Sequence, residues 1–125
     1  MSESSLLDPL FDRVPELQDW WREAKELDLG LTSQTVDLAN EILDRPPSET
    51  SQLLRKISPA LELLLRDYDD KDEISLGFIH PLGAEAARRG LDMSAIRGSL
   101  GPLAQQTWDA LHADRMQRAQ RRPAV

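Results

Sequence analysis

The sequence predicts an all-α fold, a single-domain irregular or orthogonal bundle of five to six helices. Apolar residues recur at the i, i+3, i+4, i+7 spacing of a helix face through most of the chain. Prolines and glycines stand between these stretches, where they begin or end helices. No two stretches alternate in a way that would pair as strands. A length of 125 residues suits one domain, 1–125, with a core of its own.

The N-terminal part of the chain predicts a lead-in segment and a first helix. Residues 1–14 are expected to pack on the body as the lead-in. Pro15 suits the first helical position, because its missing N–H would have no partner there. One helix face then carries apolar residues until Gly30 ends the helix: Leu17, Trp20, Trp21, Ala24 and Leu27.

A second helix is expected to follow, with Thr32 or Ser33 as its N-cap. Its apolar stripe consists of Val36, Ala39, Ile42 and Leu43. Pro46 and Pro47 end it, since neither can donate a backbone hydrogen bond.

The central element is expected after Ser48, which is the next N-cap candidate. Two interpretations fit its proline: one helix kinks at Pro59, or Ser58 caps a new helix that begins with Pro59. Because the phase is unbroken, both pieces face one core in either case. The apolar series is Leu53, Leu54, Ile57, Leu61, Leu64, Leu65 and Tyr68.

The segment 74–82 fits either a strand or a helix, and a helix is predicted because a lone strand would have no partner. Pro81 and Gly83 are expected to interrupt it. Short helical turns should follow, one ending at Gly90 and one at Gly98.

The last helix is expected to open at Gly101–Pro102. Its inner face should carry Leu103, Ala104, Trp108 and Leu111. Residues 119–125 are expected to form a basic, frayed tail.

Charge divides the chain unevenly. Residues 1–75 hold 18 acidic and 8 basic residues, whereas residues 76–125 hold 4 and 7. The net charge of −7 favours a basic partner and disfavours nucleic-acid or membrane binding by the main body. Solubility alone is the simpler explanation of the same charge.

Composition also restricts the compartment and the chemistry. The absence of cysteine excludes disulfides, thiolate metal sites and cysteine nucleophiles. No apolar stretch approaches the roughly 20 residues of a transmembrane helix, and the start does not resemble a secretory signal. These features predict a soluble, cytoplasmic protein.

No motif predicts catalysis, a cofactor or a metal. His80 and His112 belong to no ligand motif, and neither a serine elbow nor a phosphate-binding glycine loop is present. The acidic segment from Asp67 fails as a calcium loop at three positions, because Lys71, Asp72 and Phe78 stand where an oxygen ligand, glycine and glutamate are needed. A protein that is not an enzyme is therefore expected.

Two acidic segments are candidate partner-binding surfaces, and the alternative for each is a solvated surface. In the first helix Glu16, Asp19, Glu23 and Glu26 fall within an arc of about 80°, beside the apolar face. Trp20 and Trp21 differ by about 100°, so one of them should be partly exposed, with Trp20 the candidate anchor. The turn that follows the central element would extend this surface with Asp67, Asp69, Asp70, Asp72 and Glu73.

Three further stretches carry a resemblance: the entry Phe11–Glu16, the segment Ile74–Leu82, and Leu100–Leu103 before Trp108. With the leucine-rich central helix and its acidic turn, the chain resembles an uncharacterised bacterial family of small acidic all-helical proteins, some of which look like immunity proteins of polymorphic toxin systems. The His80–Pro81 pair and the arginine-rich end depart from that pattern.

The resemblance implies a cytoplasmic protein that neutralises a cognate toxin or effector by binding and occluding it. The alternative is a regulatory or scaffolding helical module of a larger assembly. The arginine-rich end is weak evidence for nucleic-acid binding. The sequence leaves open the oligomeric state and which face binds.

Overall fold

A computed structural model describes residues 7–12, 14–27, 30–68 and 71–121, with the backbone alone for residues 71 and 114–121. The all-α prediction is confirmed, because every element is a helix and the described residues contain no strand. Five of the described helices have ten residues or more. The elements are α1 (Asp8–Phe11), α2 (Pro15–Leu27), α3 (Leu31–Leu43), α4 (Pro47–Asp67), α5 (Lys71–Ile74), the π-helix η2 (Ser75–Ile79), α6 (His80–Arg89), α7 (Met93–Gly98) and α8 (Pro102–Arg121).

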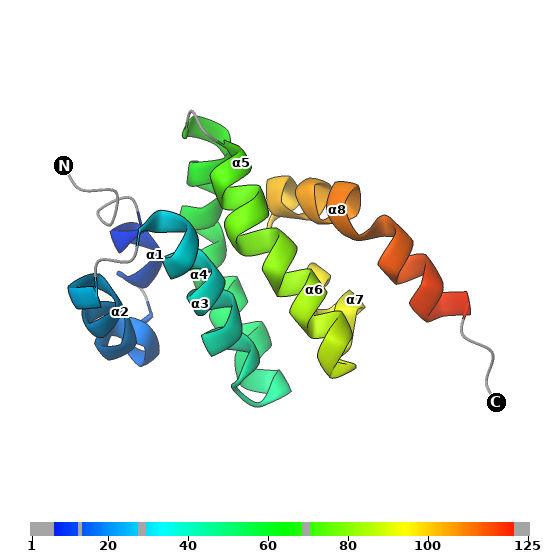
Figure 1. Ribbon diagram of the computed structural model, residues 1–125, viewed down its shortest axis with the longest axis horizontal. Coiled ribbons are helices and arrows are strands. Elements are labelled where there is room, and N and C mark those ends of the chain that lie inside the picture. Colours follow the sequence, from blue (N-terminus) through cyan, green and yellow to red (C-terminus); the bar gives the residue numbers. More distant parts are fainter. Residues whose placement is uncertain (1–6, 13, 28–29, 69–70, 122–125) are drawn as a thin grey trace.

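The helices form an irregular bundle around one core. Figure 1 shows α3, α4 and the continuous stretch from α5 to α6 in the middle of the molecule, with α2 at one end and α8 at the other. The first described residues pack on the body as expected of the lead-in, since Leu7, Leu10, Phe11 and Val14 are buried. The centre of the core contains Leu38, Ile42, Leu53, Leu54, Ile57, Leu61, Ile79, Leu82 and Trp108.

α4 is one helix through Pro59, which decides between the two interpretations of this proline. Because proline has no N–H, the carbonyl of Arg55, four residues before Pro59, lacks its usual helical donor. Both residues lie on the exposed side of α4. Water can hydrate that carbonyl, so the helix continues. The apolar series predicted for α4 does face the core.

Both predicted N-caps in this region are wrong. α3 begins at Leu31 after Gly30, whose φ is 91°, so Thr32 and Ser33 lie inside its first turn. α4 begins at Pro47, which places Ser48 inside the helix as well. Thr50 of α4 contacts the end of α3 instead, because its hydroxyl donates to the Ile42 carbonyl at 2.9 Å.

The helix predicted over 74–82 is present, but Pro81 and Gly83 do not interrupt it. A π-turn precedes the proline, and the His80 N–H donates to the Ser75 carbonyl five residues earlier. In a regular α-helix the Pro81 ring would collide with the carbonyl four residues back, and the wider π-turn accommodates it. The helix then runs to Arg89 and ends at Gly90, which adopts the left-handed conformation.

α7 and α8 follow the predicted order. Asp92 caps α7 by accepting a hydrogen bond from the Ala95 N–H at 3.1 Å, and Gly98 is the last residue of this helix. α8 begins at Pro102 and buries Ala104 and Trp108, as predicted. It continues to Arg121, past residue 119 where the tail is predicted to begin, and residues 122–125 lie outside the described part of the chain.

Candidate functional site

Most residues of α2 are exposed. Only Leu17 and Trp21 are buried among its residues. Trp21 stacks on Phe11 at 4.6 Å between ring centroids, and its indole N–H donates to the Asp8 carboxylate at 2.7 Å. The prediction that one of the two tryptophans is partly exposed is confirmed, because Trp20 is half-buried whereas Trp21 is buried.

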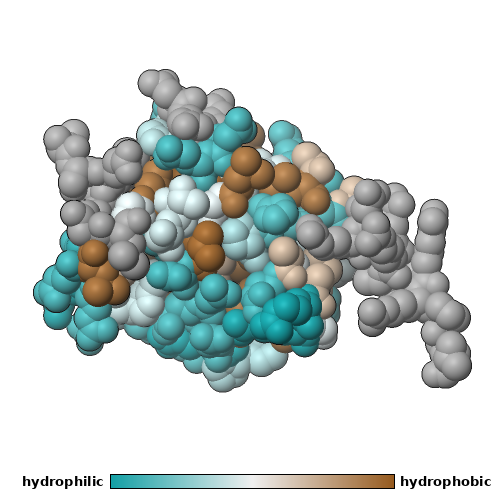
Figure 2. All heavy atoms as spheres, in the orientation of Figure 1, coloured by the Kyte–Doolittle hydropathy of each residue, from teal (hydrophilic) through white to brown (hydrophobic). Residues whose placement is uncertain are grey.

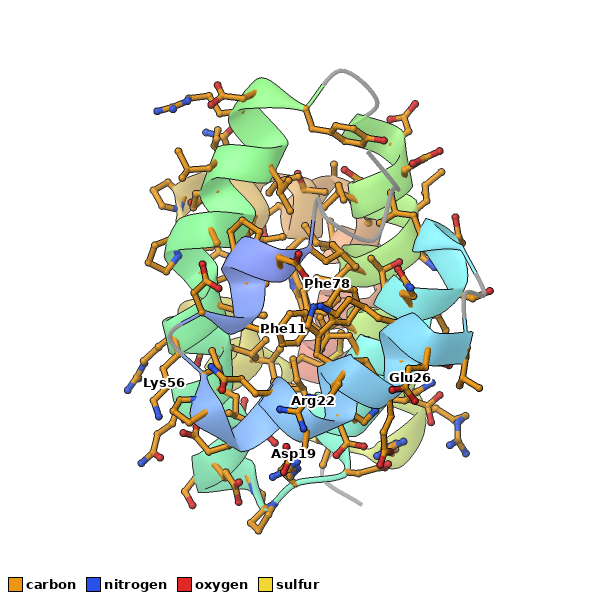
Figure 3. All side chains as sticks on the ribbon, turned by 90° about the vertical axis from the view of Figure 1, so that its left-hand side faces the viewer. Phe11, Asp19, Arg22, Glu26, Lys56 and Phe78 are labelled. Atoms are coloured by element: carbon orange, nitrogen blue, oxygen red, sulfur yellow. The ribbon has the colours of Figure 1, made fainter. Side chains whose placement is uncertain are left out.

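The carboxylates of α2 differ in their partners. Glu16 pairs with Lys56 of α4 at 2.9 Å, and this hydrogen bond lowers the pKa of Glu16. Asp19 pairs with Arg22 at 3.3 Å. Figure 3 shows Lys56 beside the start of α2, with Asp19, Arg22 and Glu26 along its outer side.

Glu23 and Glu26 are exposed and form no ion pair with another residue in the described ranges. Among the carboxylates of α2, those without an ion-pair partner in the described structure are therefore the two in its second half.

An apolar strip runs beside these carboxylates. Trp20, Ala24 and Leu27 follow one another at the i, i+4, i+7 spacing of one helix face. Trp20 and Ala24 pack partly on the core, whereas Leu27 is 65% exposed. Figure 2 shows an apolar patch over α2 among hydrophilic atoms. We call Trp20, Glu23, Ala24, Glu26 and Leu27 the α2 face.

The acidic turn after α4 does not join the α2 face. Figures 1 and 3 share a vertical axis, and both show the end of α4 and α5 at the top of the molecule and α2 in its lower half. The Asp67 carboxylate accepts from the Arg66 guanidinium at 2.9 and 3.0 Å, and Glu73 accepts from the Tyr68 hydroxyl at 3.1 Å. Asp72 is exposed, while Asp69 and Asp70 lie outside the described residues. The predicted single surface therefore consists of two separate regions.

The two histidines, 32 positions apart, meet in the fold. Their ring centroids are 5.7 Å apart, and Trp108 packs edge-on against His112 at 4.7 Å. His112 is fully buried, with its Nε2 3.0 Å from the Ile79 carbonyl oxygen. The sequence did carry a signal for the burial of His112, because this residue follows Trp108 by four positions and so lies on the same, buried face of α8. Nowhere in the described ranges do three or more histidine, aspartate or glutamate side chains gather as metal ligands would.

The described residues line two hollows that open on the surface. One, of about 410 Å³, lies where η2 meets α8 and is lined by Asp72, Ser75, Leu76, Gln106, Thr107, Ala110 and Leu111. The other, of about 300 Å³, lies between α1 and α2 and is lined by Asp8, Phe11, Asp12, Gln18, Trp21, Arg22 and Lys25. Sequence reasoning missed both, because each needs two elements brought together.

Lowered carboxylate pKa values occur in surface ion pairs. The hydrogen bond from Lys56 lowers the pKa of Glu16, and the one from Arg97 lowers the pKa of Asp109. Arg88 and Arg89 together lower the pKa of Glu85. None of these three carboxylates lines either hollow. Their charges serve as salt-bridge partners between or within helices.

Within the described residues, no helix combines the length and the apolar character needed to cross a bilayer. Comparison with protein-family models, curated proteins and solved structures found no match to this chain.

Proposed function

We propose that this protein is an immunity-type or inhibitory protein, which binds a basic toxin or effector in the cytoplasm through the α2 face and occludes it. In this proposal it catalyses no reaction. The observation that carries the proposal is the arrangement on α2: partly exposed Trp20 and Leu27 beside Glu23 and Glu26, which have no ion-pair partner in the described structure.

The apolar strip and the carboxylates would contribute differently. Burying an apolar side chain such as Leu27 contributes about 1.5–3 kcal/mol, whereas an exposed ion pair contributes about 0–1 kcal/mol. The strip therefore supplies most of the affinity. The carboxylates accelerate association with a positively charged surface, and salt screens this effect over about 8 Å.

The partner to test is a basic toxin or effector domain encoded beside this chain, with both proteins purified. Glu23→Lys should slow association at low salt, and the difference should shrink at high salt. Its control is Asp37→Lys, which makes the same change of charge at an exposed position of α3.

A second pair of variants tests the apolar strip. Leu27→Asp should speed dissociation by about tenfold or more, because a buried leucine is lost from the complex. Leu63→Asp, on α4, is the control, because Leu63 is also exposed, at 50%. Equal effects of variant and control in both pairs, or a toxin that stays active in the complex, would contradict the proposal.

A regulatory or scaffolding module remains the second candidate. The observation that favours it is Leu76, which is 57% exposed at the hollow between η2 and α8, a hollow that shares no lining residue with the α2 face. Binding through that apolar surface would be insensitive to Glu23→Lys.

A further inference from the structure

The hollow between α1 and α2 has an aromatic floor and charged walls. Phe11 and Trp21 form the floor, since both line the hollow, both are buried, and their rings stack on each other. Figure 3 views the molecule from this end, with Phe11 above Arg22 of α2. Four charged side chains belong to the lining: Asp8, Asp12, Arg22 and Lys25.

Lys25 already places a cation against this aromatic floor. Its Nζ lies 5.6 Å from the centre of the Trp21 ring and 3.3 Å from the Asp8 carboxylate. The face of an indole ring attracts a cation, as a carboxylate does. The side chains of Lys25 and Asp8 remain 41% and 45% exposed, so water and salt weaken their pairing. Another cation can therefore displace Lys25.

The carboxylates of the hollow are suited to hold such a cation. The indole N–H of Trp21 donates to the Asp8 carboxylate at 2.7 Å, and because the ring is buried this bond orients the carboxylate. Asp12 is exposed and forms no ion pair with another described residue. Arg22 pairs at 3.3 Å with Asp19, which does not line the hollow. One oriented and one unpaired carboxylate thus lie beside an aromatic ring.

We propose that this hollow binds an arginine side chain of a protein partner, whose guanidinium takes the place of the Lys25 ammonium. A planar guanidinium can stack on the indole ring and donate to carboxylates, whereas an ammonium is a compact and strongly hydrated charge. The volume of about 300 Å³ suits one side chain better than a larger ligand.

This inference deepens the proposed function, on which it rests for the identity of the partner, by naming a group that the basic partner presents. No residue of the α2 face lines the hollow. The two sites can therefore be tested separately.

Titration of the full chain with N-acetylarginine amide, followed by NMR, tests the site without a toxin. The indole N–H resonance of Trp21 should shift and saturate, whereas that of Trp108, which does not line the hollow, should stay in place. The citrulline analogue has nearly the same shape without the charge, so it should give no saturable shift.

Two variants test whether Lys25 competes with the probe. Lys25→Gln should tighten binding of N-acetylarginine amide by about two- to fivefold, because the competing cation is removed. A lysine with a merely structural role would not produce this gain. Arg55→Gln is the matched control, since it removes one positive charge at an exposed position of α4 and should leave the affinity unchanged.

A second pair of variants tests the unpaired carboxylate. Asp12→Asn should weaken binding of the probe by about two- to fivefold. Asp37→Asn makes the same change at an exposed position of α3 and should have no effect. Circular dichroism of each variant establishes that it is folded.

Several outcomes would overturn the proposal: no saturable shift, an equal shift with the citrulline analogue, or equal effects of a variant and its control. Tighter binding of N-acetyllysine amide would overturn the choice of arginine. Tighter binding of N-acetylglutamate amide would assign the hollow to an acidic group held by Arg22 and Lys25. These failures are distinct from a failure of Glu23→Lys to slow toxin binding, which concerns the α2 face alone.

Discussion

At the scale of single residues, Gly83 allows the ring of His112 to pack directly against α6. The imidazole of His112 lies directly against Gly83, and a Cβ at position 83 would overlap the ring. The ring has no free space to move into, because it also contacts Trp108 and the Ile79 carbonyl. Glycine is therefore required here for space, although its backbone is ordinary α-helix.

Gly83→Ala should destabilise the protein by about 1–3 kcal/mol, the usual range for adding a methyl group to a filled core. Denaturant unfolding measures the change. Gly98→Ala is the matched control, since a Cβ there meets no atom within 4 Å. It should be neutral or stabilise α7 by up to about 1 kcal/mol. If Gly83→Ala and Gly98→Ala have the same free energy of unfolding, the His112 ring moves aside for the added methyl group.

At the scale of elements, α8 depends on a side chain from α4 for its start. The Glu62 carboxylate accepts hydrogen bonds from the N–H groups of Leu103 at 2.9 Å and Ala104 at 3.2 Å. These N–H groups have no partner within α8, and a negative charge is favourable at a helix N-terminus. Glu62 thus caps α8 and also links it to α4, although the two bonded residues are 41 positions apart in the sequence.

Glu62→Ala should lower the free energy of unfolding by about 0.5–2 kcal/mol, as the loss of other N-caps does. Glu62→Gln keeps one acceptor oxygen and should lose less. The control is Glu23→Ala, which removes an exposed glutamate that has no ion pair in the described structure. If Glu62→Ala and Glu23→Ala unfold at the same denaturant concentration, Glu62 does not cap α8 in solution.

At the scale of the whole molecule, ion pairs connect helices that meet through the core. Arg89 of α6 donates to Glu85 at 3.0 Å and to Asp44 at 2.7 Å, just after α3. Arg45 bridges Glu41 of α3 and Glu49 of α4, each at 3.0 Å. The charged surface therefore joins α3, α4 and α6 on the outside, as the apolar core does on the inside.

This charge network predicts a pH dependence of stability. Hydrogen bonds from Arg88 and Arg89 lower the pKa of Glu85 from its ordinary 4.5 to about 2 in the folded protein. Because the folded pKa is lower than the unfolded one, the ionised carboxylate stabilises the fold above pH 4.5. That contribution is lost as the pH falls from 4.5 towards 2.

Unfolding of the wild type and of Glu85→Gln should therefore differ most above pH 4.5, and the difference should shrink between pH 4.5 and 2. In a chain that also carries Arg88→Gln and Arg89→Gln, Glu85→Gln should have no effect that depends on pH in this window. A difference that persists unchanged to pH 2 would mean that Glu85 is not held by these arginines.

The sequence by itself determined the helical class, the approximate positions of α2, α3, α4 and α8, and most of the core. These features are local: the apolar spacing, proline and glycine act within one or two turns, as at Pro15, Gly90 and Pro102. The α2 carboxylates and the partial exposure of one tryptophan were predictable for the same reason. The N-caps were not, because Gly30 and Pro46 precede α3 and α4 without a side-chain cap.

Only the tertiary structure decided what depends on residues far apart in the chain. It joined His112 to Gly83 and Glu62 to α8, and it separated the acidic turn from α2. It also decided that the helices continue through Pro59 and Pro81. At Pro59 solvent can hydrate the carbonyl that lacks an N–H partner, and at Pro81 a π-turn makes room for the ring. Helix periodicity states which side of a helix is buried, whereas the packing of several helices decides what that side meets.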